Sequence, residues 1–344
     1  MKKVLIITTI LSTTAGTAMA QSSVTLYGVA DVAIGKAKSV GDQKWGVQSN
    51  GIVNNNNSLI GLTGKENLGG SLWAGFKYEG SVNLANGAAG GGGGLDGGPI
   101  WSRSAYVALG SNSWGTVMLG RNYSPGFDGQ GTYELTEWAN YSVLGNTFGF
   151  GGYPDWLSSA QIEYRTPSIH GLSAELAYIS KADGILVDDG VTNRSDRWDL
   201  NVAYDQGPIK AAITANQSSK TQTGGDGNKP SYSIGGSYIF GNSFTLSASY
   251  NRANSAQQWR GAGGNPVWGA RRYGWELGGK FFTGPFTVTL DLTRDTKNDL
   301  YGGKKYTNGL LEGKYALSKH TFLYIDYLRL DGNNNYGLGI DHSF

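Results

Sequence analysis

The hydropathy of this chain alternates with a period of two residues along nearly its whole length. The segment 286–293 shows the pattern most clearly, because Phe286, Val288, Leu290 and Leu292 alternate with Thr287, Thr289, Asp291 and Thr293. Successive side chains of a β-strand point to opposite faces, so the pattern predicts strands with one apolar and one polar face. Segments 24–36, 198–204 and 244–251 alternate in the same way. The fold class is therefore predicted to be all-β.

The composition agrees with this prediction. The 344 residues include 55 glycines, 20 tyrosines, 11 phenylalanines and 10 tryptophans, and no cysteine. Glycine is unfavourable in helix interiors, so this glycine content argues against a helix-rich protein. The formal net charge of +2 gives no reason to expect a general affinity for nucleic acid.

The amino terminus has the form of a secretory signal peptide. Lys2 and Lys3 precede a short apolar stretch at 4–11, and Ala18-Met19-Ala20 forms a small-residue cleavage site. We therefore expect residues 1–20 to be a signal peptide and 21–344 to be a single mature domain. Lys2 and Lys3 account for the whole excess of basic over acidic residues, so the mature chain is formally neutral.

Two β architectures fit an exported chain of this kind, a soluble sandwich and a transmembrane barrel. No later stretch reaches the ~18 consecutive apolar residues of a membrane-spanning helix. Aromatic residues lie at the ends of the apolar strand faces, as in the pairs Phe244/Tyr250 and Trp198/Tyr204. Interface girdles of aromatic residues are typical of a barrel whose outer face meets lipid. The pattern therefore favours the barrel.

Short and long connections alternate along the chain. The seven short ones fall at 66–69, 110–113, 167–171, 206–208, 241–242, 284–285 and 318–319. The eight long ones fall at 37–57, 84–101, 122–158, 183–195, 218–230, 253–270, 296–304 and 331–335. Together they predict a 16-stranded antiparallel transmembrane β-barrel, with short turns at the periplasmic end and long loops outside. A barrel of this size leaves an aqueous lumen.

Several segments resemble one known family. They are SVTLYGVAD at 23–31, GLTGKENLG at 61–69, RSAYVAL at 103–109, GTVMLGRNY at 115–123, YALSK at 315–319 and GIDHSF at 339–344. In this order and spacing they resemble the Gram-negative general diffusion porins of the beta-proteobacterial type, such as those of Neisseria, Bordetella, Comamonas and Burkholderia. The resemblance implies a homotrimer in the bacterial outer membrane, in contact with lipid and lipopolysaccharide, and a third loop that folds into each pore.

The third long connection has the chemistry expected of such a loop. Between residues 127 and 156 it contains eight aromatic residues, too many for a solvated disordered segment. Its charged side chains are all acidic, namely Asp128, Glu134, Glu137 and Asp155. We expect these carboxylates to line a constriction, because charged side chains at a narrow point set the ion selectivity of a channel.

Basic residues of the strands are the expected opposite wall. By strand parity the polar face carries Lys65, Lys77, Arg103, Arg165, Arg197, Lys210, Arg272, Lys280 and Lys314. The resemblance adds Arg121, the arginine of the Leu-Gly-Arg motif, although its parity matches the apolar Val117 and Leu119. Charged residues on the lipid face would cost ~2–4 kcal/mol at the membrane midplane, which favours the lumen for the parity set.

The chain departs from the family pattern at three positions. The second strand usually carries an arginine and a lysine where this chain has Leu59 and Thr63, and Asp341 stands where an arginine is usual. With a weakened basic wall and a neutral mature chain, we expect weak ion selectivity in either direction.

The predicted function is passive diffusion of ions and small hydrophilic solutes through a water-filled channel, without a cofactor, a metal or enzymatic activity. A substrate-specific channel is an alternative, in which the inward-facing Tyr27, Trp73, Phe322 and Tyr324 form a binding track. A structural or adhesive barrel with a plugged lumen is a further alternative.

Overall fold

A computed structural model describes residues 23–40, 44–89, 99–151, 157–180, 196–218, 229–254 and 270–344. The expected signal peptide and the acidic residue Asp155 lie outside these ranges. Among the described residues, no helix has both the length and the apolar character needed to cross a membrane.

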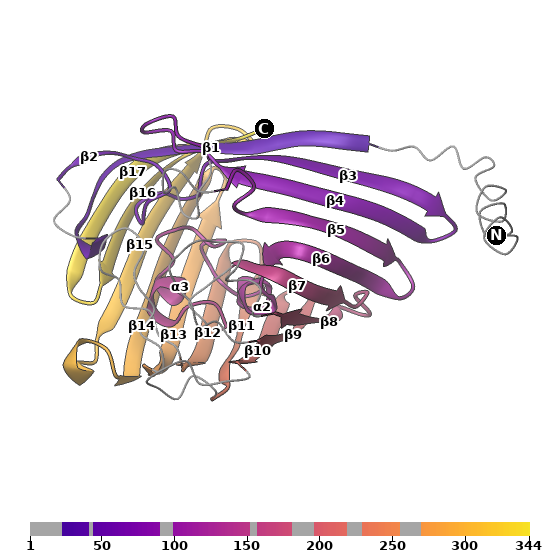
Figure 1. The fold of residues 1–344 in the computed structure, drawn as a ribbon. Coiled ribbons are helices and arrows are strands. Elements are labelled where there is room, and N and C mark those ends of the chain that lie inside the picture. The colour runs from indigo at the N-terminus through magenta and orange to yellow at the C-terminus, as the bar shows by residue number, and fades with distance from the viewer. Residues whose placement is uncertain are drawn as a thin grey trace, which may run out of the picture.

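A single antiparallel sheet contains the seventeen strands of the described ranges. The short β2 (Gly46–Gln48) lies in the first loop, and the other sixteen form the barrel wall (Figure 1). The wall strands are β1 (Ser23–Ala37), β3 (Leu59–Gly69), β4 (Leu72–Ser81), β5 (Ser104–Ser111), β6 (Gly115–Tyr123), β7 (Leu157–Arg165), β8 (Leu172–Ile179), β9 (Arg197–Gln206), β10 (Ile209–Ser218), β11 (Ser231–Phe240), β12 (Phe244–Ala253), β13 (Arg272–Thr283), β14 (Phe286–Asn298), β15 (Thr307–Ala316), β16 (Thr321–Leu330) and β17 (Asn333–Ser343).

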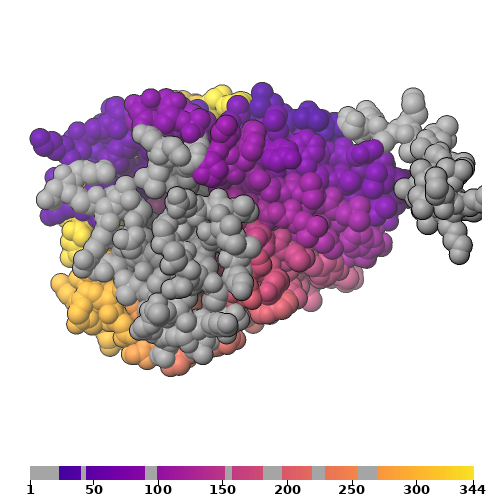
Figure 2. All heavy atoms as spheres, viewed as in Figure 1, coloured from indigo at the N-terminus to yellow at the C-terminus, as the bar shows by residue number. Residues whose placement is uncertain are grey.

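Pairing of the first and last strands closes the sheet. β1 pairs with β3 through residues 23–29 and with β17 through residues 29–37, so neither strand is left as a free edge. Closure gives the backbone N–H and C=O groups of these strands hydrogen-bond partners that lipid could not supply. In Figure 2 the side chains of β3 to β6, coloured purple to magenta, cover the outer surface of this part of the wall.

The distribution of polar residues is the reverse of that in a soluble β-protein. On β14, Val288, Leu290 and Leu292 are exposed, whereas Thr289, Asp291 and Thr293 are buried. The sandwich alternative would bury the apolar face instead. The outer face of this barrel is therefore the lipid-facing one, and its polar face encloses the lumen.

Two connections differ from the expectation. β3 continues to Gly69, so the first short turn lies at 70–71 and not at 66–69. The eighth connection, expected to be a long loop at 331–335, is a two-residue turn formed by Asp331 (φ 50°) and Gly332 (φ 83°). Hairpin turns with two positive φ angles match the twist of the flanking strands, which allows β17 to start at Asn333.

The first and third loops fold into the barrel. Loop 3 carries the short helices α2 (Pro125–Gly131) and α3 (Val143–Phe148), which lie inside the ring of strands in Figure 1. α2 lies against β8, β9 and β10, and α3 lies against β12 to β16. The described residues also include two short helical turns in loops, η1 (Lys38–Val40) and η4 (Tyr301–Gly303). Both inserted loops contribute to a hydrophobic core within the lumen: Ile52 and Val53 from loop 1 and Ala139, Tyr141 and Val143 from loop 3.

Candidate pore constriction

Loop 3 owes its shape to helix caps and to aromatic packing. Ser124 begins α2 by accepting a hydrogen bond from the Phe127 amide at 3.2 Å, and Pro125 fits the first turn of a helix. The Phe127 and Trp138 rings stack with their centroids 4.7 Å apart, and the Trp138 indole donates to the Phe127 carbonyl at 3.1 Å. These contacts make the loop a compact body inside the barrel.

Hydrogen bonds attach this body to distant parts of the wall. The Gln130 amide donates to Asn251 Oδ1 on β12 at 2.9 Å. The hydroxyls of Thr147 and Thr293 on β14 lie 2.9 Å apart. The Tyr141 hydroxyl donates to Asn55 Oδ1 of loop 1 at 2.9 Å. Loop 3 therefore has a fixed position in the lumen.

Asp128 is the loop 3 carboxylate that reaches the β7 wall. It forms an ion pair with Arg165, which also contacts Glu163 and lies 3.5 Å from a carboxylate oxygen of Glu175. Oxygens of Asp128, Glu163 and Glu175 lie within 4.8 Å of one another, a spacing that could hold a metal ion. The Arg165 guanidinium already supplies positive charge to all three carboxylates, so the cluster is an ion-pair network.

Glu137 approaches the opposite wall. Its carboxylate lies 2.8 Å from Lys280 Nζ on β13, and 80% of its side-chain surface is exposed. Glu137 and Trp138 both have a φ of 62°, and this unusual turn directs the carboxylate into open lumen. Enclosure by the barrel raises the pKa of Glu137, but attraction to Lys280, and to Lys314 beyond it, outweighs that effect and leaves the pKa below its usual value.

Glu134 differs from the expectation that it lines the aperture. Only 7% of the residue is exposed, and its carboxylate accepts hydrogen bonds from the amides of Thr136 and Trp138 at 2.8 and 2.9 Å and from the Thr136 hydroxyl at 2.6 Å. Burial raises the pKa of Glu134. The sequence places Glu134 and Glu137 in one acidic loop, but only Glu137 of these two faces water.

A second network lies on the wall formed by β1, β4, β5 and β6. Glu79 Oε1 accepts from Arg103 Nε at 2.6 Å, and Oε2 accepts from the Tyr27 hydroxyl at 2.8 Å and lies 2.9 Å from Lys77 Nζ. Arg103 also donates to the Tyr123 hydroxyl at 2.8 Å. The structure thus brings Lys77 and Arg103 together at one carboxylate that the sequence reasoning did not include.

Lys65 and Arg121 lie apart from these networks. Lys65 Nζ lies 4.5 Å from the centre of the Trp73 ring. Arg121 donates to the Ser102 carbonyl at 2.7 Å and to the Ser159 hydroxyl at 2.5 Å. The strand pairing is irregular at 120–122, yet Asn122 still reaches Glu163 on the lumen side, so Arg121 keeps the parity of the lipid-facing residues.

Four acidic partners of the wall cations share a simple sequence signal. They stand two residues from a basic residue, on the same face of the same strand, in the pairs Lys77/Glu79, Glu163/Arg165, Arg197/Asp199 and Glu312/Lys314. Since residues i and i+2 of a strand point to the same face, this pattern could have been found from the sequence. It shows that much of the basic wall is neutralised by its own strand.

Loop 1 accounts for the unusual Asp341. Asp341 and Asp31 face each other across the β1–β17 pair, where two like charges would repel. Asn54 donates to Asp31 at 2.7 Å, and Asn56 donates to Asp341 at 2.9 Å. The run of four asparagines at 54–57 thus satisfies a pair of buried acids.

The aromatic residues of the proposed binding track do not have equivalent surroundings. Tyr324 is 1% exposed, and its hydroxyl donates to Asp31 at 2.6 Å. Its ring packs against Tyr141 of loop 3. Tyr324 is therefore part of the packing between loop and wall, whereas Tyr27 belongs to the Glu79 network.

Comparisons with known proteins agree with this architecture. Residues 8–335 match the family model described as Gram-negative porin. Outer membrane porin protein 32 of Delftia acidovorans is 33% identical over 256 residues, which cover 70% of this chain and 67% of the relative. An outer membrane porin protein of Bordetella pertussis, strain Tohama I, is 27% identical over 405 aligned residues and is matched along the full length of both chains.

Two solved structures share the fold. An anion-selective porin from Comamonas acidovorans superimposes with a TM-score of 0.70 at 24% identity, over 94% of this chain and 100% of the other. OmpF of Salmonella typhi, in a complex with daunomycin, gives a TM-score of 0.69 at 18% identity over 93% and 97% of the two chains. Both likenesses extend over the whole barrel.

Proposed function

The chain belongs to the Gram-negative porin family of outer-membrane channels, and from this premise we propose that its pore is weakly ion-selective because many of its wall cations are paired with carboxylates. Ions and small hydrophilic solutes pass down their gradients, without a cofactor or an energy source.

The pairing of fixed charges is the observation that carries the proposal. Lys77 and Arg103 share Glu79, Arg165 is surrounded by three carboxylates, Lys280 meets Glu137, and Lys314 lies 3.0 Å from Glu312. A row of unpaired charges would attract one sign of ion strongly, whereas neutral pairs produce a local field with little net sign. Such pairs orient water and dipolar solutes at the aperture.

The anion selectivity named for the Comamonas porin need not extend to this chain. By the family resemblance, Leu59 and Thr63 replace two basic residues of the second strand. Both changes remove positive charge from the wall. We therefore expect the ion selectivity of this channel to be weaker than that of an anion-selective porin.

Planar-bilayer recording tests whether the pore is open and general. We expect stable, ohmic single-channel steps, and flux of neutral sugars that declines with size. A lumen that conducts no current would support the structural alternative and contradict the proposal. Current block by one solute at micromolar concentration, with no block by its isomers, would support a substrate-specific channel instead.

We also propose that three copies assemble and that the signal peptide is removed after Ala20. The family resemblance supports the trimer, and the Ala18-Met19-Ala20 motif supports the cleavage site. Mass measurement of the native complex purified from outer membranes should give three mature chains, each beginning at Gln21. A monomeric complex or a retained leader would contradict the respective proposal.

A further inference from the structure

One basic residue of the barrel wall lacks the carboxylate partner that the others have. Of the nine cations that strand parity assigns to the polar face, eight lie 3.9 Å or less from a carboxylate oxygen. Among the described residues Lys65 on β3 is the exception, and it is exposed. A fixed charge without a partner attracts ions of the opposite sign more strongly than a neutral pair does. Lys65 is therefore the wall cation most available to a passing anion.

The Lys65 ammonium lies over an aromatic ring. Its Nζ is 4.5 Å from the centre of the half-buried Trp73 ring on β4. The six-membered part of the indole lies against two glycines, since a Cβ at Gly110 would come within 2.3 Å of Trp73 Cζ2, and one at Gly75 within 3.2 Å of Cζ3. Glycine allows this close approach of ring and backbone. The wall takes up one side of the ring, so the side next to Lys65 is the one that a solute can reach.

Both side chains lie on the part of the wall that loop 3 leaves open. The two helices of loop 3 lie against β8 to β10 and against β12 to β16, on the side of the barrel away from β3 and β4. Trp73 is the second residue of β4, directly after the short turn at 70–71, and so lies at the periplasmic end. A solute on its way between the constriction and the periplasm therefore passes Trp73 and Lys65.

The neighbouring wall cation is turned toward a different partner. Lys77 lies on the same face of β4 as Trp73, but its Nζ is 2.9 Å from Glu79 Oε2. Lys65 is opposite Gly75, midway between Trp73 and Lys77 along β4. Lys65 thus leans toward the periplasmic end and Lys77 away from it. Among the described residues of this wall, Lys65 alone supplies positive charge at the Trp73 ring.

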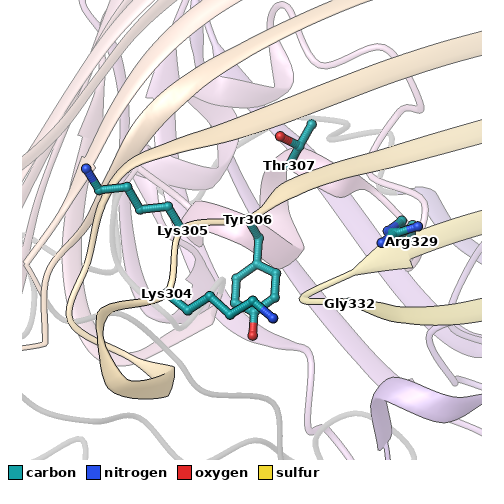
Figure 3. Close-up of a pocket in the computed structure, with 6 residues that line it drawn as sticks. All are labelled: Lys304, Lys305, Tyr306, Thr307, Arg329 and Gly332. Atoms are coloured by element: carbon teal, nitrogen blue, oxygen red, sulfur yellow. The ribbon is translucent and has the colours of Figure 1, made fainter.

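The cations at the rim of the long loops lie outside this path. Figure 3 shows an open recess of about 440 Å³ whose lining includes Lys304, Lys305 and Arg329. Arg329 shares the exposed face of β16 with Ile325, which is the outer face of the barrel. This recess therefore does not contribute to the lumen wall that contains Lys65.

An ammonium beside an accessible ring face suits a carboxylate attached to a planar aromatic body. Aromatic rings attract one another in offset or edge-to-face arrangements. An exposed cation–π contact is weak, so a solute carboxylate can replace the Trp73 ring as the partner of Lys65. An inorganic anion would use Lys65 alone, and an uncharged ring would use Trp73 alone. An aromatic carboxylate uses both.

We propose that Lys65 and Trp73 form a binding site for aromatic carboxylates at the periplasmic end of the lumen, where the solute ring packs on Trp73 and its carboxylate pairs with the Lys65 ammonium. The inference rests on the proposed function, because a solute reaches this site only through an open pore. Both contacts are exposed and individually weak, so the solute is retained at millimolar concentration and the channel stays general. The site gives aromatic carboxylates a modest advantage over aliphatic carboxylates of similar size.

Single-channel recording of the full-length mature protein in KCl, with added sodium benzoate, tests the site. Benzoate should reduce the open-channel current with a half-maximal effect in the millimolar range. Cyclohexanecarboxylate has the same charge and a similar size but no aromatic ring, so it should require a roughly fivefold higher concentration. Equal half-maximal concentrations for the two anions would overturn the proposal.

Variants of the two residues locate the effect. Lys65→Gln and Trp73→Leu should each raise the half-maximal benzoate concentration roughly fivefold, whereas Trp73→Phe should retain most of the affinity. Stable conductance in KCl shows that each variant still forms the barrel. Lys319→Gln, which removes an exposed cation from a turn at the same rim, is the matched control and should behave like the unmodified channel. An unaltered benzoate effect in Lys65→Gln would overturn the proposal.

The reversal potential in a KCl gradient without benzoate tests the proposed function separately. A potential close to zero combined with no effect of benzoate would overturn only the Lys65–Trp73 site. A large potential combined with the expected benzoate effects would support the site and contradict the weak ion selectivity.

Discussion

At the scale of single residues, Glu134 and Glu137 lie three positions apart in loop 3 but have different roles. The Glu134 carboxylate is surrounded by donors from its own loop, so it stabilises the turn. The Glu137 carboxylate lies in open lumen beside Lys280. Both are acids of an irregular segment without a hydrophobic period, and the sequence therefore contains no signal that separates them.

Replacement of Glu137 tests the electrostatic role of the aperture. In Glu137→Gln, Lys280 loses its partner and adds one uncompensated positive charge, so the channel should shift toward anions without a change in barrel stability. The reversal potential in a KCl gradient measures the shift. The matched control is Glu66→Gln, which changes an exposed residue near the periplasmic end of β3 and should leave the reversal potential unaltered. An unchanged reversal potential in Glu137→Gln would contradict the assigned position.

The pH dependence follows from the lowered pKa of Glu137. A carboxyl with a depressed pKa stays ionised as the pH falls to the usual glutamate value of ~4.3, and it is neutralised only below that. The difference in reversal potential between the unmodified channel and Glu137→Gln should therefore persist from pH 7 to about pH 4.3 and disappear at lower pH. Loss of the difference already near pH 6 would mean that the pKa is raised.

At the scale of elements, loop 3 depends on long-range contacts that the sequence does not reveal. The family resemblance implied that this loop folds into the barrel, and its aromatic residues and single-sign charge fitted that role. The bond between Tyr141 and Asn55 could not be predicted, because loop 1 reads as a solvated, asparagine-rich segment. Ile52 and Val53 are too short an apolar run to indicate that this loop enters the lumen and packs against β1 and β17.

Truncation of Glu134 should loosen loop 3 and leave the barrel intact. Glu134→Ala leaves buried donors of Thr136 and Trp138 without an acceptor, at a local cost of about 2–3 kcal/mol. We expect noisier single-channel current and faster proteolysis within the loop, while the heat-resistant barrel still forms. Glu137→Ala is the matched control, because it removes an exposed acid of the same loop. Equal current noise in the two variants would contradict a structural role for Glu134.

At the scale of the whole molecule, the period of two and the alternating connections were sufficient to predict the closed sixteen-stranded barrel. The predicted long loop at the eighth connection was wrong, because Asp331 and Gly332 form a two-residue turn. Their positive φ angles cannot be inferred from a run of polar residues. Strand parity predicts that the basic wall faces the lumen. A prediction based on the basic residues alone did not include the acidic residues two positions away, which neutralise part of this wall.

The charge balance of the lumen is tested most directly by the reversal potential of the unmodified channel across a planar bilayer with a tenfold KCl gradient at pH 7. Paired charges predict a potential close to zero, with cation and anion permeabilities of the same order. A potential close to the limit for an ideally anion-selective membrane, ~59 mV for a tenfold gradient of a univalent ion, would contradict a balanced lumen. A comparable potential of the opposite sign would contradict it equally.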